Sequence, residues 1–184
     1  MIYSPVIHQS QQKTYRNIPR KTDQRKTDQR KTDQARFLVI GYSSDTTSDH
    51  AVGIQIANRI SAWKLPSVTS IATYQLTPAL VNHLALVDYA FFISSCQTLC
   101  RAETLQLDPI SVSTQPPQNK QSAAKTTPFT LLNLSQQLYG RAPQAWLLQI
   151  PTDSTSYSKE LSAMAQRGCD RALRTIERFL ITYR

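Results

Sequence analysis

Residues 37–63 read FLVIGYSSDTTSDHAVGIQIANRISAW, and this stretch contains the pattern of a strand, a loop and a helix in that order. The first six residues form a continuous apolar run ending near Gly41, which is typical of a parallel strand buried on both faces. After the polar loop 43–49, apolar side chains recur at helical spacing, at Val52, Ile56, Ile60 and Trp63. Asp49 lies near the expected N-cap of this helix. The stretch therefore predicts the first strand and helix of a βαβ unit.

The next segments repeat this alternation of buried strands and helices. Residues 67–74 (SVTSIATY) follow Pro66 and are rich in β-branched side chains, and residues 89–96 (YAFFISSC) are apolar almost throughout. Between these two strands, Thr77 and Pro78 occupy the N-cap and N1 positions at which a helix often begins. Three buried strands joined by two short helices predict a βαβαβ unit with a parallel sheet.

The second half of the domain contains an edge strand and further helical segments. Residues 105–113 alternate weakly between apolar and polar side chains and include Pro109, which a sheet tolerates at its edge. Beyond them the hydrophobic pattern predicts a helix, a strand and a long final helix, at 127–140, 145–150 and 159–182. Gly140 is expected to end the first of these helices.

Together these elements predict one α/β domain over residues 37–184, a three-layer sandwich in which helices flank a mostly parallel twisted sheet. The edge strand at 105–113 is the candidate for an antiparallel neighbour. In open sheets of this kind, ligands bind beyond the carboxyl ends of the strands. Three segments meet that description, the loop 43–50, the segment 94–100 and the polar loop 114–127.

Residues 1–36 form a basic segment of different composition. They hold nine Lys or Arg and three Asp, a net charge of +6 out of +9 for the chain. The pentapeptide RKTDQ occurs three times between Arg20 and Gln34 without an apolar residue, which predicts a disordered tail. A weak tether to anions or nucleic acid is one interpretation, and a tolerated tandem duplication is the interpretation that we favour. The repeat has no aromatic side chain on which nucleic-acid bases would stack.

Cysteine content and hydropathy indicate the cellular compartment in which we expect the protein. The chain has an odd number of cysteines, Cys96, Cys100 and Cys169. They fit neither a disulfide framework nor a C-x-x-C pair. No apolar run approaches the ~20 residues that a membrane-spanning helix requires, and the N-terminus lacks the apolar segment of a secretory signal. We therefore expect reduced thiols, a cytoplasmic setting and no membrane contact.

Four segments resemble the hydrogenase maturation proteases, over residues 37–183 in all. The most specific is LLNLSQQLYGRAPQAWLLQIP (131–151), and it is supported by YQLTPAL (74–80), ELS (160–162) and AVG (51–53). Members of this family are α/β endopeptidases that remove a C-terminal peptide from the nickel-containing large subunit of a hydrogenase. The resemblance implies this fold, an aspartic-type-like peptidase activity, the large-subunit precursor as partner and a small monomer.

The same resemblance places the metal ligands of the family on residues that are not the usual acids. Asp49 matches the Asp of the first loop, but the acidic ligand beside it is His50 in this chain. The Asp expected at the end of the third strand is Ser94, and the His expected before the next helix falls on Lys125 or its neighbour Ala124. The resemblance implies no cofactor of the protein's own, because the family senses nickel in its substrate.

These replacements predict weak metal binding. Divalent ions bind best to carboxylate and imidazole groups, so one imidazole, a hydroxyl and an ammonium group make a poor set of ligands. We therefore interpret the chain as a divergent, impaired or non-catalytic homologue that keeps a surface for the hydrogenase large subunit. Two alternatives stay open. One is an active endopeptidase that uses His50 and rearranged ligands, and the other is a tethering protein that acts through its basic tail.

Other residues at the expected strand ends offer weaker hypotheses. Cys96 and His50 would make a nucleophile and base if they met, although a buried cysteine more often packs as a small apolar side chain. Ser43, Ser44 and Ser94 lack the G-x-S-x-G pattern of a hydrolase nucleophile. His50 is the remaining candidate for a metal ligand, but a site needs several ligands with matching geometry, and a lone His there more often contacts the helix terminus.

Overall fold

The computed structural model describes residues 34–43, 49–96, 105–112, 126–152 and 160–183. The RKTDQ repeats lie outside these ranges except for their last residue, Gln34, and so do Ser44, Cys100, Ala124 and Lys125. The interpretations given for those residues therefore stay predictions. Within the described ranges, no helix is long and apolar enough to cross a membrane.

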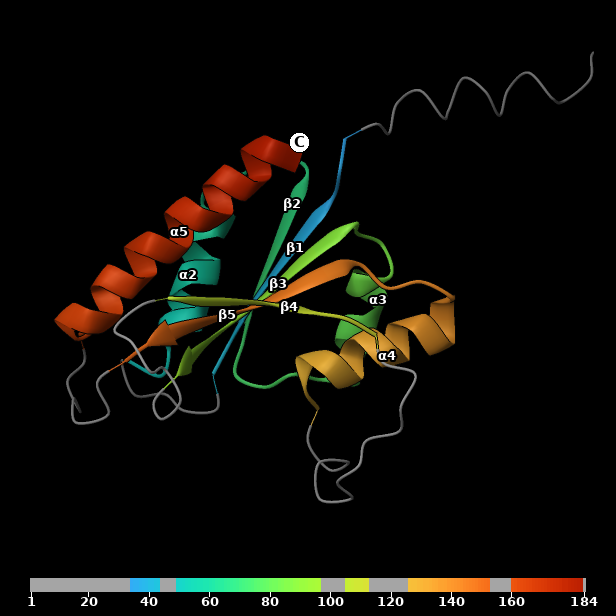
Figure 1. Ribbon diagram of the computed structural model, residues 1–184, viewed down its shortest axis with the longest axis horizontal. Coiled ribbons are helices and arrows are strands. Elements are labelled where there is room, and N and C mark those ends of the chain that lie inside the picture. Colours follow the sequence, from blue (N-terminus) through green and yellow to red (C-terminus); the bar gives the residue numbers. More distant parts are fainter. Residues whose placement is uncertain (1–33, 44–48, 97–104, 113–125, 153–159, 184) are drawn as a thin grey trace, which may run out of the picture. The chain divides into compact units, whose positions relative to one another are not determined.

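Five strands form one sheet in the order β2-β1-β3-β5-β4 (Figure 1). They are β1 (Phe37–Tyr42), β2 (Val68–Thr73), β3 (Tyr89–Cys96), β4 (Gln106–Ile110) and β5 (Gln144–Pro151). Strands β2, β1, β3 and β5 run parallel to their neighbours, and β4 pairs antiparallel with β5. This topology confirms the mostly parallel sheet, and it makes the Pro109 strand an antiparallel edge.

Helices cover both faces of this sheet. Those in the described ranges are α2 (Val52–Ser61), the 3-10 helix η2 (Pro78–Leu80), α3 (Val81–Leu84), α4 (Pro128–Tyr139) and α5 (Ala163–Tyr183). Helices α2 and α5 lie on one side of the sheet, and α3 and α4 lie on the other (Figure 1). The described domain is thus the three-layer α/β sandwich that the sequence predicts.

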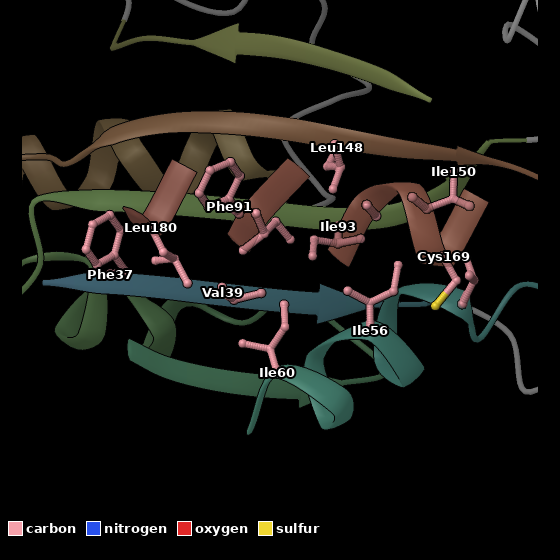
Figure 2. Packing of buried hydrophobic residues seen from close by; sticks show 13 residues of the cluster. Phe37, Val39, Ile56, Ile60, Phe91, Ile93, Leu148, Ile150, Cys169 and Leu180 are labelled. Carbon is pink, nitrogen blue, oxygen red and sulfur yellow. The ribbon is translucent and has the colours of Figure 1, made fainter. Parts of the chain in front are cut away.

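The buried run of β1 explains why the sheet needs helices on both faces. Phe37 and Val39 pack in the layer with α2 and α5, and Leu38 and Ile40 pack in the layer with α3 and α4. All four side chains are fully buried. Successive side chains of a strand point to opposite faces, so a continuous apolar run requires cover on both sides. Figure 2 shows the layer between the sheet and helices α2 and α5.

The boundaries of two helices differ from the prediction. Helix α2 begins at Val52 rather than near Asp49, and it has no side-chain cap. The carboxylate of Asp49 instead accepts a hydrogen bond from the backbone N–H of Ser162 at 2.7 Å. The final helix also begins later than expected, because residues 160–162 are not helical. The prediction of the cap failed because a distant backbone donor competes for the carboxylate, and sequence spacing does not show that donor.

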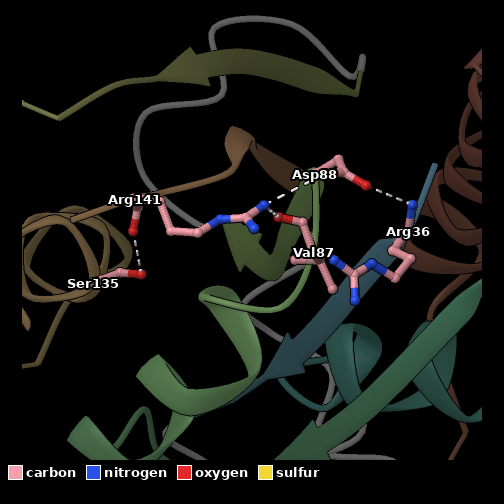
Figure 3. A network of polar contacts seen from close by, with 5 residues as sticks. All are labelled: Arg36, Val87, Asp88, Ser135 and Arg141. Atoms are coloured by element: carbon pink, nitrogen blue, oxygen red, sulfur yellow. Dashed lines mark hydrogen bonds and ion pairs between the residues drawn. The ribbon is translucent and has the colours of Figure 1, made fainter. Parts of the chain in front are cut away.

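The LYGRAP turn between α4 and β5 is held by contacts near the amino ends of β1 and β3 (Figure 3). The guanidinium of Arg141 donates to the carbonyl of Val87 at 3.2 Å and lies 3.4 Å from the carboxylate of Asp88. The carbonyl of Arg141 accepts the hydroxyl of the buried Ser135 at 2.8 Å. Asp88 also accepts the backbone N–H of Arg36 at 2.9 Å. This turn therefore has a structural role at the amino end of the sheet.

Candidate functional site

A pocket of about 480 Å³ opens at the carboxyl ends of the parallel strands. Its walls come from the end of β1, the turn after β2, the end of β3 and the start of α4. The lining residues are Tyr42, Ser43, Tyr74, Gln75, Leu76, Ser94, Ser95, Thr126, Thr127 and Pro128. This is the edge of the sheet at which an open α/β fold is expected to bind its ligands.

The lining of the pocket is rich in hydroxyl groups. Ser, Thr and Tyr supply seven of the ten residues, and the described lining contains no Asp, Glu, Lys, Arg or His. Hydroxyls both donate and accept hydrogen bonds, so this wall suits neutral polar groups such as peptide amides. Divalent cations, in contrast, bind preferentially to carboxylates, imidazoles or thiolates.

Tyr42 and Ser94 form a side-chain hydrogen bond between the neighbouring strands β1 and β3. Burial raises the pKa of the Tyr42 phenol above its ordinary value, and the hydrogen bond with Ser94 lowers it by less. The phenol is therefore neutral at physiological pH. At the position where the family resemblance implies a carboxylate, the pocket wall thus carries a pair of neutral hydroxyls.

The start of α4 supplies a second wall, and its geometry follows from local sequence. The Thr127 hydroxyl accepts the backbone N–H of Thr130 at 3.1 Å, and the Thr130 hydroxyl accepts the backbone N–H of Thr127 at 2.8 Å. Pro128 begins the helix at a position that needs no N–H donor. Gly140 ends it at φ +68°, a conformation that glycine adopts at little cost. The predicted start and end of this helix are both confirmed.

Close packing on the sheet fixes the start of α2. A Cβ atom on Gly53 would lie 2.4 Å from the carbonyl oxygen of Ile93, and one on Gly41 would lie 1.9 Å from the carbonyl oxygen of Gly53. Both distances are shorter than van der Waals contact, so only glycine fits at either position. This approach sets the first turn of α2 against the ends of β1 and β3, directly after Asp49 and His50.

Three of the four site positions that the sequence suggests lie among the described residues. Ser94 lines the pocket, but Asp49 and His50 are not among its lining residues. Asp49 is 2% exposed and holds the backbone of Ser162, which makes it a structural residue. His50 is half-buried in the turn before α2. Lys125 lies outside the described residues.

The cysteines at this end of the sheet are buried. Cys96 is 7% exposed, and its carbonyl accepts the backbone N–H of Thr152 at 3.3 Å. Cys169 is fully buried, and burial raises the pKa of its thiol, so the nucleophilic thiolate is disfavoured. Both cysteines have the burial of small apolar core residues. In the part of the chain that the structure describes, no group of three His, Cys, Asp or Glu side chains is arranged to hold a metal ion.

Tyr42, Tyr74, Thr126 and Thr127 line the pocket but were not predicted from the sequence as individual site residues, although the candidate loop 114–127 contains the last two. Each lies at or just beyond a strand end, or just before a helix, which is where the fold predicts a site. Residue type did not identify them. An aromatic side chain at the end of a buried strand commonly packs into the core, and a Thr before a helix commonly serves as its cap.

Known structures resemble this fold over most of the chain. A NiFe hydrogenase maturation protease HycI from Thermococcus kodakarensis matches with a TM-score of 0.60 at 17% identity, over 81% of this chain and 94% of that one. The hydrogenase maturating endopeptidase HybD from E. coli matches with a TM-score of 0.56 at 16% identity, over 80% and 93%. A hydrogenase 2 maturation peptidase from Thaumarchaeota archaeon SCGC_AB-539-E09 matches with a TM-score of 0.56 at 19% identity, over 79% and 97%.

This chain has the fold of the hydrogenase maturation proteases. The agreement extends over nearly the full length of each of those three proteins. No family model matches the sequence, and no curated protein matches it. At 16–19% identity the likeness establishes the fold, while activity has to be argued from the pocket itself.

Proposed function

We propose that this protein is a divergent hydrogenase maturation protease homologue that binds the precursor of a hydrogenase large subunit without cleaving it. One observation carries the proposal. In the pocket wall, at the position where the family resemblance implies an aspartate ligand, Ser94 is hydrogen-bonded to the neutral phenol of Tyr42.

The proposed loss of cleavage follows from the chemistry of that pair. A serine hydroxyl carries no negative charge at neutral pH and is a weak ligand for a divalent ion compared with a carboxylate. The second position, His50, would supply one imidazole. A site with two replaced ligands lacks the charge needed to dock onto substrate nickel, and a metal that docks poorly does not position a scissile bond.

The proposed retention of binding rests on what the chain has kept. The pocket persists at the carboxyl edge of the sheet with a volume of about 480 Å³. Its walls are positioned by a capping box at Thr127 and by the glycine contact at Gly53. A wall of hydroxyls can hydrogen-bond the amide groups of a peptide without any metal. Binding and cleavage are thus separable in this site.

The test is the intact mass of the nickel-loaded hydrogenase large-subunit precursor from the same organism, incubated with and without this protein. We expect no loss of the C-terminal peptide, while a maturation protease with the usual ligands cuts the same sample. Binding is measured in parallel by fluorescence anisotropy of the labelled precursor. Cleavage that depends on this protein would overturn the proposal, and so would an absence of binding.

The variant His50→Ala separates the proposal from an active enzyme with rearranged ligands. We expect precursor binding to change by less than about twofold, because His50 does not line the pocket. A cleavage activity of the wild-type protein that disappears in His50→Ala would instead assign a catalytic or metal-binding role to this side chain.

A further inference from the structure

Strand β2 forms one edge of the sheet, and half of its main-chain groups point away from its neighbour. Within the sheet, the N–H of Phe37 donates to the carbonyl of Ser67 at 2.8 Å, and the N–H of Ser43 donates to the carbonyl of Thr73 at 3.3 Å. Hydrogen-bonding direction alternates along a strand. Residues 67, 69, 71 and 73 therefore face β1, and Ser70 and Ala72 direct their N–H and C=O groups outward.

These outward groups have nothing to bind in the part of the chain that the structure describes. Strand β1 occupies the inner edge of β2, and the hydroxyl of Ser70 is used on the carbonyl of Ala57 at 2.6 Å in α2. The main-chain N–H and C=O of Ser70 and Ala72 have no hydrogen-bond partner there. A row of unpaired main-chain groups on a sheet edge is a template for one more strand.

The two edges of the sheet differ in how they are protected. The other edge strand, β4, carries Asp108 and Pro109, and charge and proline both discourage further pairing. Strand β2 reads VTSIAT and contains neither a charged residue nor a proline. Its edge therefore remains chemically competent to pair, and that edge is the one beside the pocket.

The edge leads directly into the pocket. The chain leaves β2 at Thr73, and the next three residues, Tyr74, Gln75 and Leu76, line the pocket. Tyr74 is 62% exposed. An extended segment laid along β2 would therefore bring one of its ends to Tyr74, on the β2 side of the pocket. The pocket lining is uncharged in its described part, so it favours a neutral polar side chain or a peptide group.

We propose that the open edge of β2 binds an extended, uncharged peptide segment of the partner protein as a sixth strand, whose end enters the pocket. This inference rests on the proposed function, and it specifies how the large-subunit precursor would be held. Main-chain hydrogen bonds to Ser70 and Ala72 supply affinity, as in other cases of strand addition, and the pocket supplies selectivity for the end of the segment.

The first test uses the full-length protein and synthetic peptides that match the C-terminal segment of the large-subunit precursor. Two peptides of equal composition carry N-methyl groups at alternate backbone positions, one set at even and the other at odd residues. Only one set faces β2, because hydrogen bonding alternates along a strand. We expect one peptide to bind about tenfold more weakly or worse, and the other to bind like the unmodified peptide.

The second test changes the protein. Ala72→Pro removes the outward N–H and leaves the hydrogen bonds to β1 in place, because the N–H of residue 72 does not face β1. We expect peptide and precursor binding to weaken about tenfold, with the melting temperature little changed. Ala72→Val is the matched control, because it keeps the N–H and the strand preference, and its binding is expected to equal that of the wild type.

The outcomes separate the two proposals. Strand addition would be overturned if both N-methylated peptides bind like the unmodified peptide and Ala72→Pro binds the precursor like the wild type. The proposed function would then still stand. A wild-type protein that binds no precursor would overturn both. A third outcome is that the wild-type protein self-associates and that Ala72→Pro abolishes this self-association without changing peptide binding. That outcome would assign the edge to a second copy of this chain and overturn the peptide as its occupant.

Discussion

The carboxylate of Asp49 accepts a hydrogen bond from the backbone N–H of Ser162 at 2.7 Å, across 113 positions of the chain. Asp49 is almost fully buried. The hydroxyl of Ser162 in turn accepts the N–H of Ala165 at 3.1 Å in the first turn of α5. A residue that the family resemblance places beside a metal ligand thus links the loop before α2 to the start of the last helix.

Asp49→Ala is expected to lower the free energy of unfolding by about 1–3 kcal/mol, because it removes the acceptor of a partly buried backbone N–H. Asp49→Asn keeps an oxygen acceptor and is expected to cost less. Urea denaturation measures both variants. Equal stability of Asp49→Ala and the wild type would show that this hydrogen bond contributes nothing to the link with α5.

Gly53→Ala is expected to lower the free energy of unfolding by about 2–3 kcal/mol, because the added Cβ would meet the backbone carbonyl of Ile93. Gly168→Ala in α5 is the matched control. There the nearest atom is the Cγ2 methyl of Ile150 at 2.6 Å, part of a side chain rather than of the backbone.

Both substitutions gain helix propensity, up to about 1 kcal/mol in a helix interior, so the difference between them reports chiefly on the contact. We expect Gly168→Ala to cost less than Gly53→Ala in the same denaturation experiment, since a side-chain methyl can shift more easily than a backbone carbonyl. A larger cost at Gly168 than at Gly53 would contradict the close approach of α2 to the sheet.

Arg141→Ala is expected to cost about 1–2 kcal/mol of stability, chiefly through the lost hydrogen bond to the carbonyl of Val87. The ion pair with Asp88 contributes little, because the two side chains are 48% and 44% exposed and water screens them. Asp88→Asn is therefore expected to change stability by less than about 0.5 kcal/mol. Equal, large losses in both variants would show that the ion pair is the dominant contact.

The raised pKa of Tyr42 predicts that the stability of the folded protein falls at alkaline pH. Burial raises the pKa of its phenol in the folded state, whereas the unfolded chain has the ordinary value of about 10. The neutral phenol contributes fully to the stability of the fold at pH values below the unfolded-state pKa. This contribution is lost as the pH rises through the pKa of the folded state. Tyr42→Phe is expected to show a shallower loss of stability above pH 10.

Ser94→Ala tests the same pair from the other side. The hydrogen bond with Ser94 lowers the pKa of Tyr42, so its removal is expected to raise that pKa further. Ultraviolet titration of the tyrosinate absorbance, with Tyr42→Phe subtracted, measures the change. A fall of the Tyr42 pKa in Ser94→Ala would contradict the hydrogen bond that defines the pocket wall.

The strands were predictable because their signal is local. The run FLVIGY places apolar side chains on both faces of β1, and this pattern is typical of a strand that is covered on both faces. Thr127, Pro128 and Gly140 likewise predicted the ends of α4, because caps depend on neighbours within four residues. The role of Asp49 was missed because its partner lies far along the chain.

The sequence by itself determined the α/β alternation and the edge position of the Pro109 strand, and its resemblance to the family predicts that His50 and Ser94 stand at positions where acids are expected. Only the tertiary structure decided that Ser94 meets Tyr42 in a hydroxyl-lined pocket and that the edge of β2 opens beside it. Periodicity and caps are properties of adjacent residues. Which side chains share a pocket depends on strand order and on the close packing of α2 at Gly53, and neither of these can be read from local spacing.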